Sequence, residues 1–198
     1  MIGFVIGNGE SRKGFDLEQL RPLGTIYGCN ALYRDFIPDV LVAVDEGMIK
    51  EIKDAIDGGL FIKDFAYREK ASNECGRILR TSYCSYEDKG YAAGPTAVKL
   101  LCTRFPGIAE VYLIGFDIYS TNGSRNNMYK GTKNYSKKDA QPVVPNNWIE
   151  KLARIFVSNS GTKFYRVTNI QANPPEWSDV DNIANITYEQ MTSKLFGR

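Results

Sequence analysis

Histidine is absent from this 198-residue chain. Because histidine is the commonest general base near neutral pH, any catalysis here must use carboxylates, tyrosines, lysines, cysteines or the substrate itself. The cysteines form no CxxC pair, so with no histidine beside them a structural zinc site is not expected. We expect reduced thiols rather than disulfides at Cys29, Cys75, Cys84 and Cys102.

Long apolar runs are also absent. The longest, such as residues 1–6 and 40–44, are far shorter than the roughly 20 residues that cross a bilayer, and no basic stretch with an apolar leader opens the chain. We therefore expect no membrane span and a cytoplasmic location. The net charge of +2 is too small to argue for nucleic acid by itself. The length and the 43% hydrophobic content predict one domain with a sizeable core, and they leave the oligomeric state open.

Short apolar runs alternate with helix-like segments along the chain. The predicted strands span residues 1–6, 24–28, 38–44, 60–62, 78–83, 110–115 and 163–167. The predicted helices span residues 15–20, 48–56, 97–104 and 146–157. This alternation favours an α/β fold with a Rossmann-like, doubly wound, mostly parallel sheet. We expect a nucleotide-binding domain over residues 1–169 and a C-terminal extension, residues 170–198, that packs on the same domain.

Residues 120–145 are polar, rich in Asn, Lys, Gly and Tyr, and show no sustained apolar period. A structureless stretch of this length inside a compact domain is uncommon and usually functional, so it predicts a mobile lid that becomes ordered when ligand binds. Basic side chains gather in it. Such a cluster is usually a solvated surface, but it is also compatible with a polyanionic acceptor, of which nucleic acid is a weakly supported example. The basic residues are Arg125, Lys130, Lys133, Lys137 and Lys138.

A glycine-containing loop, residues 7–11, directly follows the first predicted strand. Its glycines would let backbone N–H groups approach a phosphate or a sugar closely, and Asn8 and Ser11 add side-chain donors. The loop departs from GxGxxG and from the P-loop pattern, so a tight turn without ligand is an equal alternative. Ligands of doubly wound sheets bind outside the carboxyl ends of the strands, which places this loop, Asn30, Asp45 and Asp117 along one rim.

Three motifs, at residues 6–11, 28–33 and 110–119, occur in an order and at spacings that resemble the bacterial CMP-sialic-acid-dependent sialyltransferases. A Gly-Pro-Thr turn at residues 94–96, which opens a helix before the third motif, matches as well. The resemblance covers roughly residues 1–167, with the middle poorly matched. A looser similarity exists to pterin diphosphokinase-like proteins, which share a Gly-x-Gly-x-Ser loop. Carried over, the resemblance implies that the nucleotide is bound by Gly7, Asn8, Gly9, Ser11, Asn30, Gly94 and Thr96.

The same resemblance implies catalytic roles. Tyr119 would hold the departing phosphate by its hydroxyl, with Tyr129 as its partner and Tyr135 nearly as suitable. The family's proposed general base is a histidine after the lid, which this chain lacks. Asp139 in the corresponding region, or Asp45 at the tip of the third strand, would replace it, although an exposed or capping carboxylate is the alternative for both. An acidic residue at position 45 would repel a carboxylate-bearing sugar and would suit a neutral donor or a metal-bound phosphate.

The function expected from these features is a nucleotide-sugar-dependent glycosyltransferase that uses a cytidine nucleotide donor, a glycan or other hydroxyl acceptor, and no obligatory metal. One alternative is a Mg²⁺-dependent diphosphokinase-like transferase that holds ATP and metal by Asp45, Glu46 or Asp117. Another is a non-catalytic nucleotide-binding protein, which the missing histidine favours. A structural role for Asp117 is expected ahead of a ligand role, and Trp148 and Trp177 are expected to be packing residues.

Overall fold

The computed structural model describes residues 1–67, 91–120, 123–124, 126–142, 146–169 and 172–197. The strand predicted at 78–83 lies outside the described residues, as do Cys75, Cys84 and Arg125. Cys29 and Cys102 are buried free thiols, as expected. None of the helices found in the described residues has the length and apolar content that crossing a membrane requires.

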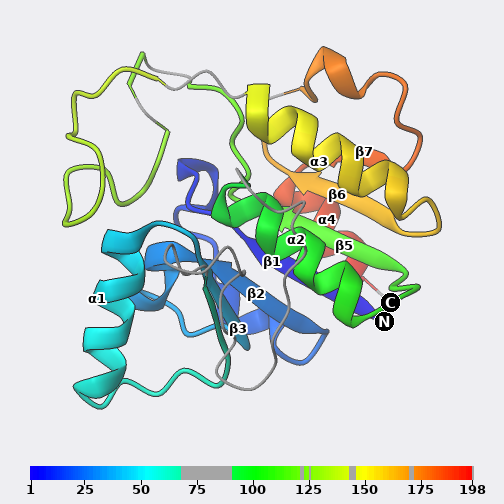
Figure 1. The fold of residues 1–198 in the computed structure, drawn as a ribbon. Coiled ribbons are helices and arrows are strands. Elements are labelled where there is room, and N and C mark those ends of the chain that lie inside the picture. The colour runs from blue at the N-terminus through cyan, green and yellow to red at the C-terminus, as the bar shows by residue number, and fades with distance from the viewer. Residues whose placement is uncertain (68–90, 121–122, 125, 143–145, 170–171, 198) are drawn as a thin grey trace.

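Seven strands in the described residues form one sheet, and every pair is parallel (Figure 1). The sheet order is β4-β3-β2-β1-β5-β6-β7, which confirms the predicted doubly wound α/β fold. The strands are β1 (Ile2–Ile6), β2 (Thr25–Cys29), β3 (Val40–Ala43), β4 (Phe65–Tyr67), β5 (Glu110–Ile114), β6 (Lys163–Val167) and β7 (Ile183–Ile186). The helices are α1 (Glu46–Asp57), α2 (Ala93–Arg104), α3 (Asn146–Ser158) and α4 (Tyr188–Phe196). Short 3-10 turns are η1 (Glu10–Arg12), η2 (Leu17–Leu20), η3 (Asn30–Arg34) and η5 (Pro175–Trp177).

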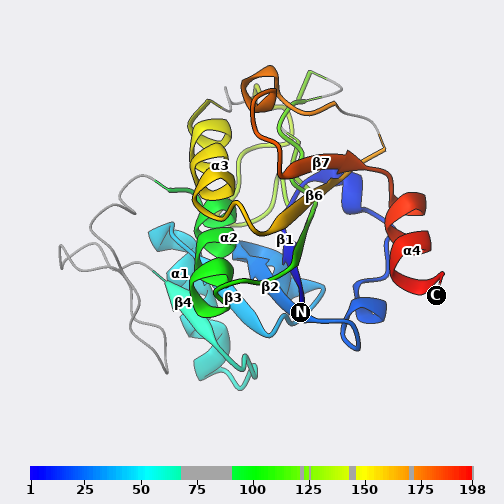
Figure 2. The same cartoon turned by 90° about the vertical axis from the view of Figure 1, so that its right-hand side faces the viewer.

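The central strands are apolar on both faces because helices cover both sides of the sheet. In β1, Val5 packs on the side of α2 and α3, whereas its neighbour Phe4 packs on the side of α1 and α4. Figure 2 shows α2 and α3 on one side of the sheet and α4 on the other. Helix α3 places Ile149 and Leu152 toward the sheet, at the spacing of one helical face.

Strand order reverses between β1 and β5. From β1 the chain adds β2, β3 and β4 outward on one side, then returns through α2 to place β5 on the other side of β1. The loop after β1 is fixed against the end of β5 by backbone hydrogen bonds from Gly7 N to Ile114 O (2.8 Å) and from Gly9 N to Gly115 O (2.9 Å). This reversal is where doubly wound sheets bind their ligands.

Two predicted elements and the C-terminal extension differ in the structure. The helix predicted at 15–20 is only the 3-10 turn η2, Leu17–Leu20. The strand predicted at 60–62 was wrong, because the chain pairs with β3 at Phe65–Tyr67 instead, while Phe61 is 78% exposed. The C-terminal extension, for which no strand or helix was predicted, contributes β7 as an edge strand on β6 and then α4. A capping box between Thr187 and Gln190 begins α4.

Candidate functional site

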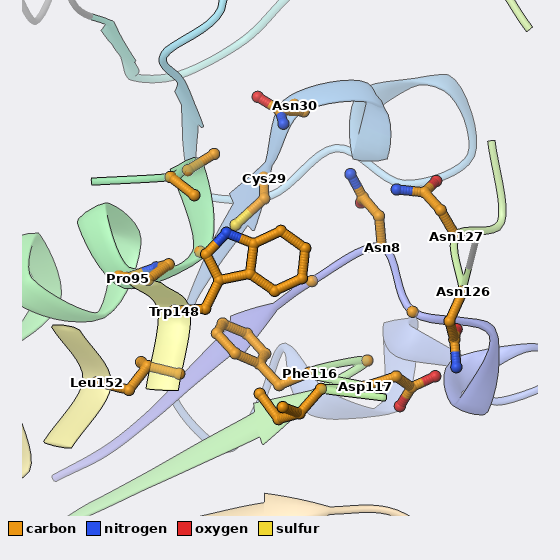
Figure 3. A pocket seen from close by; sticks show the side chains of 17 residues that line it. Asn8, Cys29, Asn30, Pro95, Phe116, Asp117, Asn126, Asn127, Trp148 and Leu152 are labelled. Atoms are coloured by element: carbon orange, nitrogen blue, oxygen red, sulfur yellow. The ribbon is translucent and has the colours of Figure 1, made fainter. Parts of the chain in front are cut away.

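A cavity of about 140 Å³ opens at the carboxyl ends of β1, β2 and β5, at the reversal of strand order (Figure 3). The backbone of the loop after β1 and the start of α2 form part of its wall. Its polar side chains are Asn8, Asn30, Asp117, Asn126 and Asn127. Its apolar side chains include Cys29, Pro95, Phe116, Trp148 and Leu152. The structure therefore gathers the first, second and third sequence motifs around one cavity.

The glycines of the loop allow it to lie against the end of β5. A Cβ atom at Gly7 would stand 2.5 Å from Gly115 O, and one at Gly9 would stand 2.6 Å from the Asp117 Cγ atom. Any side chain at either position would therefore displace backbone or a buried carboxylate. Packing of the strand ends by itself explains these glycines, and it also leaves the loop backbone exposed to the cavity.

Asn8 and Asn30 place amide groups on the cavity wall. The Asn8 Nδ2 donates to the Tyr135 hydroxyl (2.8 Å), and the Asn8 backbone oxygen accepts from Met128 N (2.8 Å). Asn30 begins η3 with a φ of 53°, a left-handed conformation that asparagine tolerates better than most residues. Among the described residues, the Oδ1 atoms of both Asn8 and Asn30 are buried without a hydrogen-bond donor. Two acceptors at the wall thus lack partners.

The N-terminus of α2 faces the cavity through Gly94 and Pro95. Its N-cap, Ala92, makes no side-chain cap, and the first turn contains no acidic residue. Pro95 has no backbone N–H, so Ala93 and Gly94 supply the N–H groups of the first turn that line the cavity. Together with the positive end of the helix dipole they favour an anion here. Thr96 does not line the cavity, because its hydroxyl donates to Ala92 O (2.9 Å) within the same helix.

Asp117 is the only carboxylate among the described residues that line the cavity. It is 7% exposed, its Oδ2 accepts from Ser11 N (2.7 Å), and its Oδ1 has no donor within the described chain. Through this hydrogen bond Asp117 connects η1 to the end of β5, which is a structural role of the kind expected from the sequence. Behind it, burial lowers the pKa of Arg166 to about 10, and the nearby Asp117 and Tyr119 oppose that shift. Arg166 therefore remains a cation at neutral pH.

Tyr119 lies at a second, small cavity of about 20 Å³. The two cavities share Asp117, Ile118, Asn126 and Trp148, so they adjoin each other. The Tyr119 ring is 37% exposed. Its position beside the larger cavity is compatible with the predicted contact to a departing phosphate.

Tyr129 belongs to the lid segment (residues 120–145) and lies away from both cavities. Its hydroxyl accepts from Arg12 Nη2 (2.7 Å) and donates to Asp35, and the side chain is 7% exposed. Tyr129 lines neither of the two cavities described above, so the structure does not bring it to Tyr119. Tyr135, the alternative partner, reaches the loop through Asn8. Burial raises the pKa of both lid tyrosines above the ordinary value.

The two predicted general bases lie outside the cavity. Asp45 is exposed at the start of α1 and makes no side-chain cap, and Asp139 is exposed in the lid segment. Neither residue is part of the cavity wall. Across the residues with described positions, no group of three or more Cys, Asp or Glu side chains is arranged to hold a metal ion.

The lid segment makes more contacts with the body than its composition predicts. Asn126 Oδ1 accepts from Glu10 N (2.8 Å), and the Lys130 ammonium pairs with the Glu10 carboxylate (2.8 Å). Further along, Arg34 donates to the Thr132 hydroxyl (2.7 Å). These contacts anchor the described part of the segment beside the cavity without a ligand, and its mobility stays a prediction.

Sequence reasoning did not place Trp148 at the cavity. It was expected to be a packing residue, and in the structure it is half-buried and lines the cavity. Trp177 confirms that expectation, since it is 3% exposed and its Nε1 donates to Ile149 O (3.0 Å). Asn126 and Asn127 were also missed. The only signal for Trp148 was its place in the first turn of the helix after the lid segment.

The fold and this cavity define a Rossmann-like α/β protein with a cavity at the reversal of strand order. Comparison with family models, with curated proteins and with solved structures gives no match. The residues that line the cavity are therefore the basis for a proposed function.

Proposed function

We propose that the protein is a nucleotide-sugar-dependent glycosyltransferase that binds a cytidine nucleotide donor in the cavity. The observation that carries this proposal is the pairing of an uncapped helix N-terminus with unpaired amide oxygens at one cavity. The first suits a phosphate, and the second suits groups that donate hydrogen bonds. A nucleotide sugar carries both.

The phosphate would lie at the start of α2. The N–H groups there and the backbone of the loop after β1 line the same cavity, and helix N-termini bind phosphates in many unrelated folds. Asp117 is a local negative charge, and the buried Arg166 behind it offsets that charge. The cavity therefore accommodates an anion without a metal ion.

The ribose, the sugar and the base would satisfy the unpaired acceptors. A buried acceptor without a donor costs about 1–3 kcal/mol, so a ligand that supplies donors to Asn8, Asn30 and Asp117 recovers that cost. Sugar hydroxyls supply such donors. The exocyclic amino group of cytosine does too, whereas the corresponding group of uracil is an acceptor. This difference favours a cytidine donor over a uridine donor independently of the sequence motifs.

The reaction would be displacement at the anomeric carbon. The acceptor hydroxyl attacks that carbon, the bond to the phosphate oxygen breaks, and the phosphate leaves with the electron pair. The N-terminus of α2 and the Tyr119 hydroxyl would stabilise the charge on the leaving phosphate. The acceptor's proton passes to a carboxylate. Asp117 lies at the cavity wall, and the exposed Asp45 and Asp139 are the bases expected from the sequence.

Thermal-shift measurements with CMP, UDP, GDP, ADP and ATP, each with and without Mg²⁺, test the proposal. A ligand that binds only the folded state stabilises it in proportion to ln(1 + [L]/Kd), so CMP should give the largest rise without metal. Incubation with CMP-sugars, with the release of CMP as the measured signal, then tests sugar transfer. A Mg²⁺-dependent preference for ATP would point to a diphosphokinase-like transferase. Tight CMP binding without turnover of any donor would indicate a binding protein.

A further inference from the structure

Trp148 differs from the other tryptophan in what surrounds it. The Trp177 indole is buried, its N–H is hydrogen-bonded, and its ring packs edge-on against Phe156 at 5.2 Å. Trp148 is only half-buried. Within the part of the chain that the structure describes, its indole makes no hydrogen bond and no stacked or edge-on ring contact of the kind that Trp177 makes. A large aromatic side chain normally gains both when it serves packing.

The position of Trp148 follows from the length of α3. Ile149 and Leu152 face the sheet, and the first turn of α3 projects past the strand ends. Trp148 and Leu152 are four residues apart, so they share a helix face, and both line the cavity. Figure 3 shows the indole reaching from α3 across the strand ends, between Cys29 and Phe116.

The cavity beside this indole is divided into an apolar and a polar part. Phe116, Pro95 and Leu152 surround the indole, whereas Asn8 and Asn127 lie across from it (Figure 3). The volume of about 140 Å³ is close to that of an engineered apolar cavity, about 150 Å³, that holds one benzene ring. The cavity therefore has room for one six-membered ring.

We propose that Trp148 is the platform on which the ligand's planar ring stacks, with the ring's polar edge directed toward the amides of Asn8 and Asn127. This inference rests on the proposed function, since it assigns the base of the bound nucleotide to one place in the cavity. The phosphate then extends toward the start of α2. Any base can stack on an aromatic side chain, so Trp148 would supply affinity for the base, and the amides would discriminate between bases.

Tryptophan emission tests this placement. Trp148→Phe keeps an aromatic plane and leaves Trp177 as the remaining tryptophan, so wild-type emission minus variant emission reports Trp148. We expect CMP to quench that difference signal and ribose 5-phosphate, which has no base, to leave it unchanged. Trp148→Ala should weaken CMP binding, measured by calorimetry, by about 5- to 150-fold, the range found when a base-stacking aromatic is removed. Trp148→Phe should keep most of the affinity.

Phe61→Ala serves as the matched control, because it removes a ring that is 78% exposed and does not line the cavity. If CMP stabilises the wild-type protein but Trp148→Ala binds it equally well, the platform is wrong and the nucleotide site stands. Quenching by ribose 5-phosphate equal to that by CMP overturns the platform as well. If no nucleotide stabilises the wild-type protein, the proposed function fails and takes this inference with it.

Discussion

Replacing Tyr129 by phenylalanine separates an anchoring role of this residue from a catalytic one. The hydroxyl is buried, accepts from the Arg12 guanidinium at 2.7 Å and donates to Asp35. Arg12 is 3% exposed and also donates to Gly7 O at 2.9 Å, so the lid segment and the glycine loop share one buried cation. Without the hydroxyl, Arg12 loses one acceptor in a place that water does not reach.

The magnitude follows from the charge of the partner. A hydrogen bond to a charged group contributes about 1.5–3 kcal/mol. For a domain of this size, each kcal/mol shifts the melting temperature by about 2–4 °C, so Tyr129→Phe should lower it by about 3–12 °C. Tyr135→Phe is the matched variant in the same segment. It removes a bond to the neutral Asn8 amide, so the loss should be smaller, about 0.5–1.5 kcal/mol.

Urea denaturation followed by circular dichroism measures both losses, and limited trypsin digestion reports whether the lid segment is released. We expect faster cleavage after Lys130 and Lys133 in the Tyr129→Phe protein. A Tyr129→Phe protein as stable as wild type, with slower sugar transfer, would refute the anchoring role and restore Tyr129 as the leaving-group partner of Tyr119.

Three further predictions concern Asn8 and Gly9 of the glycine loop and the buried Tyr188. Asn8→Ala should weaken CMP binding by about 1–3 kcal/mol in calorimetry, and unchanged affinity in a folded protein would mean that the loop is only a turn. Gly9→Ala should destabilise the fold by about 1–3 kcal/mol in urea, because its Cβ would meet Asp117 at 2.6 Å; a change below about 0.5 kcal/mol would contradict the packing argument. Burial raises the pKa of Tyr188 to about 12, above its ordinary value of about 10. The unfolded chain therefore loses this proton first, and stability that is complete below about pH 10 should fall toward pH 12, less steeply in Tyr188→Phe.

The fold was predictable because its central strands carry their own signal. β1, β3 and β5 are short apolar runs of the kind typical of buried parallel strands. Their alternation with helices predicts the α/β fold class. β4 carries no such signal, since its three residues become a strand through pairing with β3. The apolar run at 60–62 predicts a strand there, but in the structure Leu60 is half-buried and Phe61 is exposed.

The site was predictable where a motif follows a strand and unpredictable where partners are distant. Asn8 and Asn30 directly follow β1 and β2, so strand order alone brings them together. The Tyr129 hydroxyl meets Arg12, which is 117 positions earlier, and no local pattern reports such a pair. Trp148 was misjudged for a related reason. Its exposure depends on how far α3 extends past the sheet, which is a property of the packed structure.

The central place of β1 has a consequence for how this protein is made. β1 is synthesised well before one of its two neighbours, β5, whose residues Glu110–Ile114 pair with Ile2–Ile6. The residues between the two strands, 7–109, must be synthesised before that edge of β1 is covered. Until then the nascent chain presents a strand with unpaired backbone groups and apolar side chains, which is the kind of surface that chaperones hold. Pairing over such a sequence separation is slow, so we expect the cavity, which needs the ends of both strands, to form late in folding.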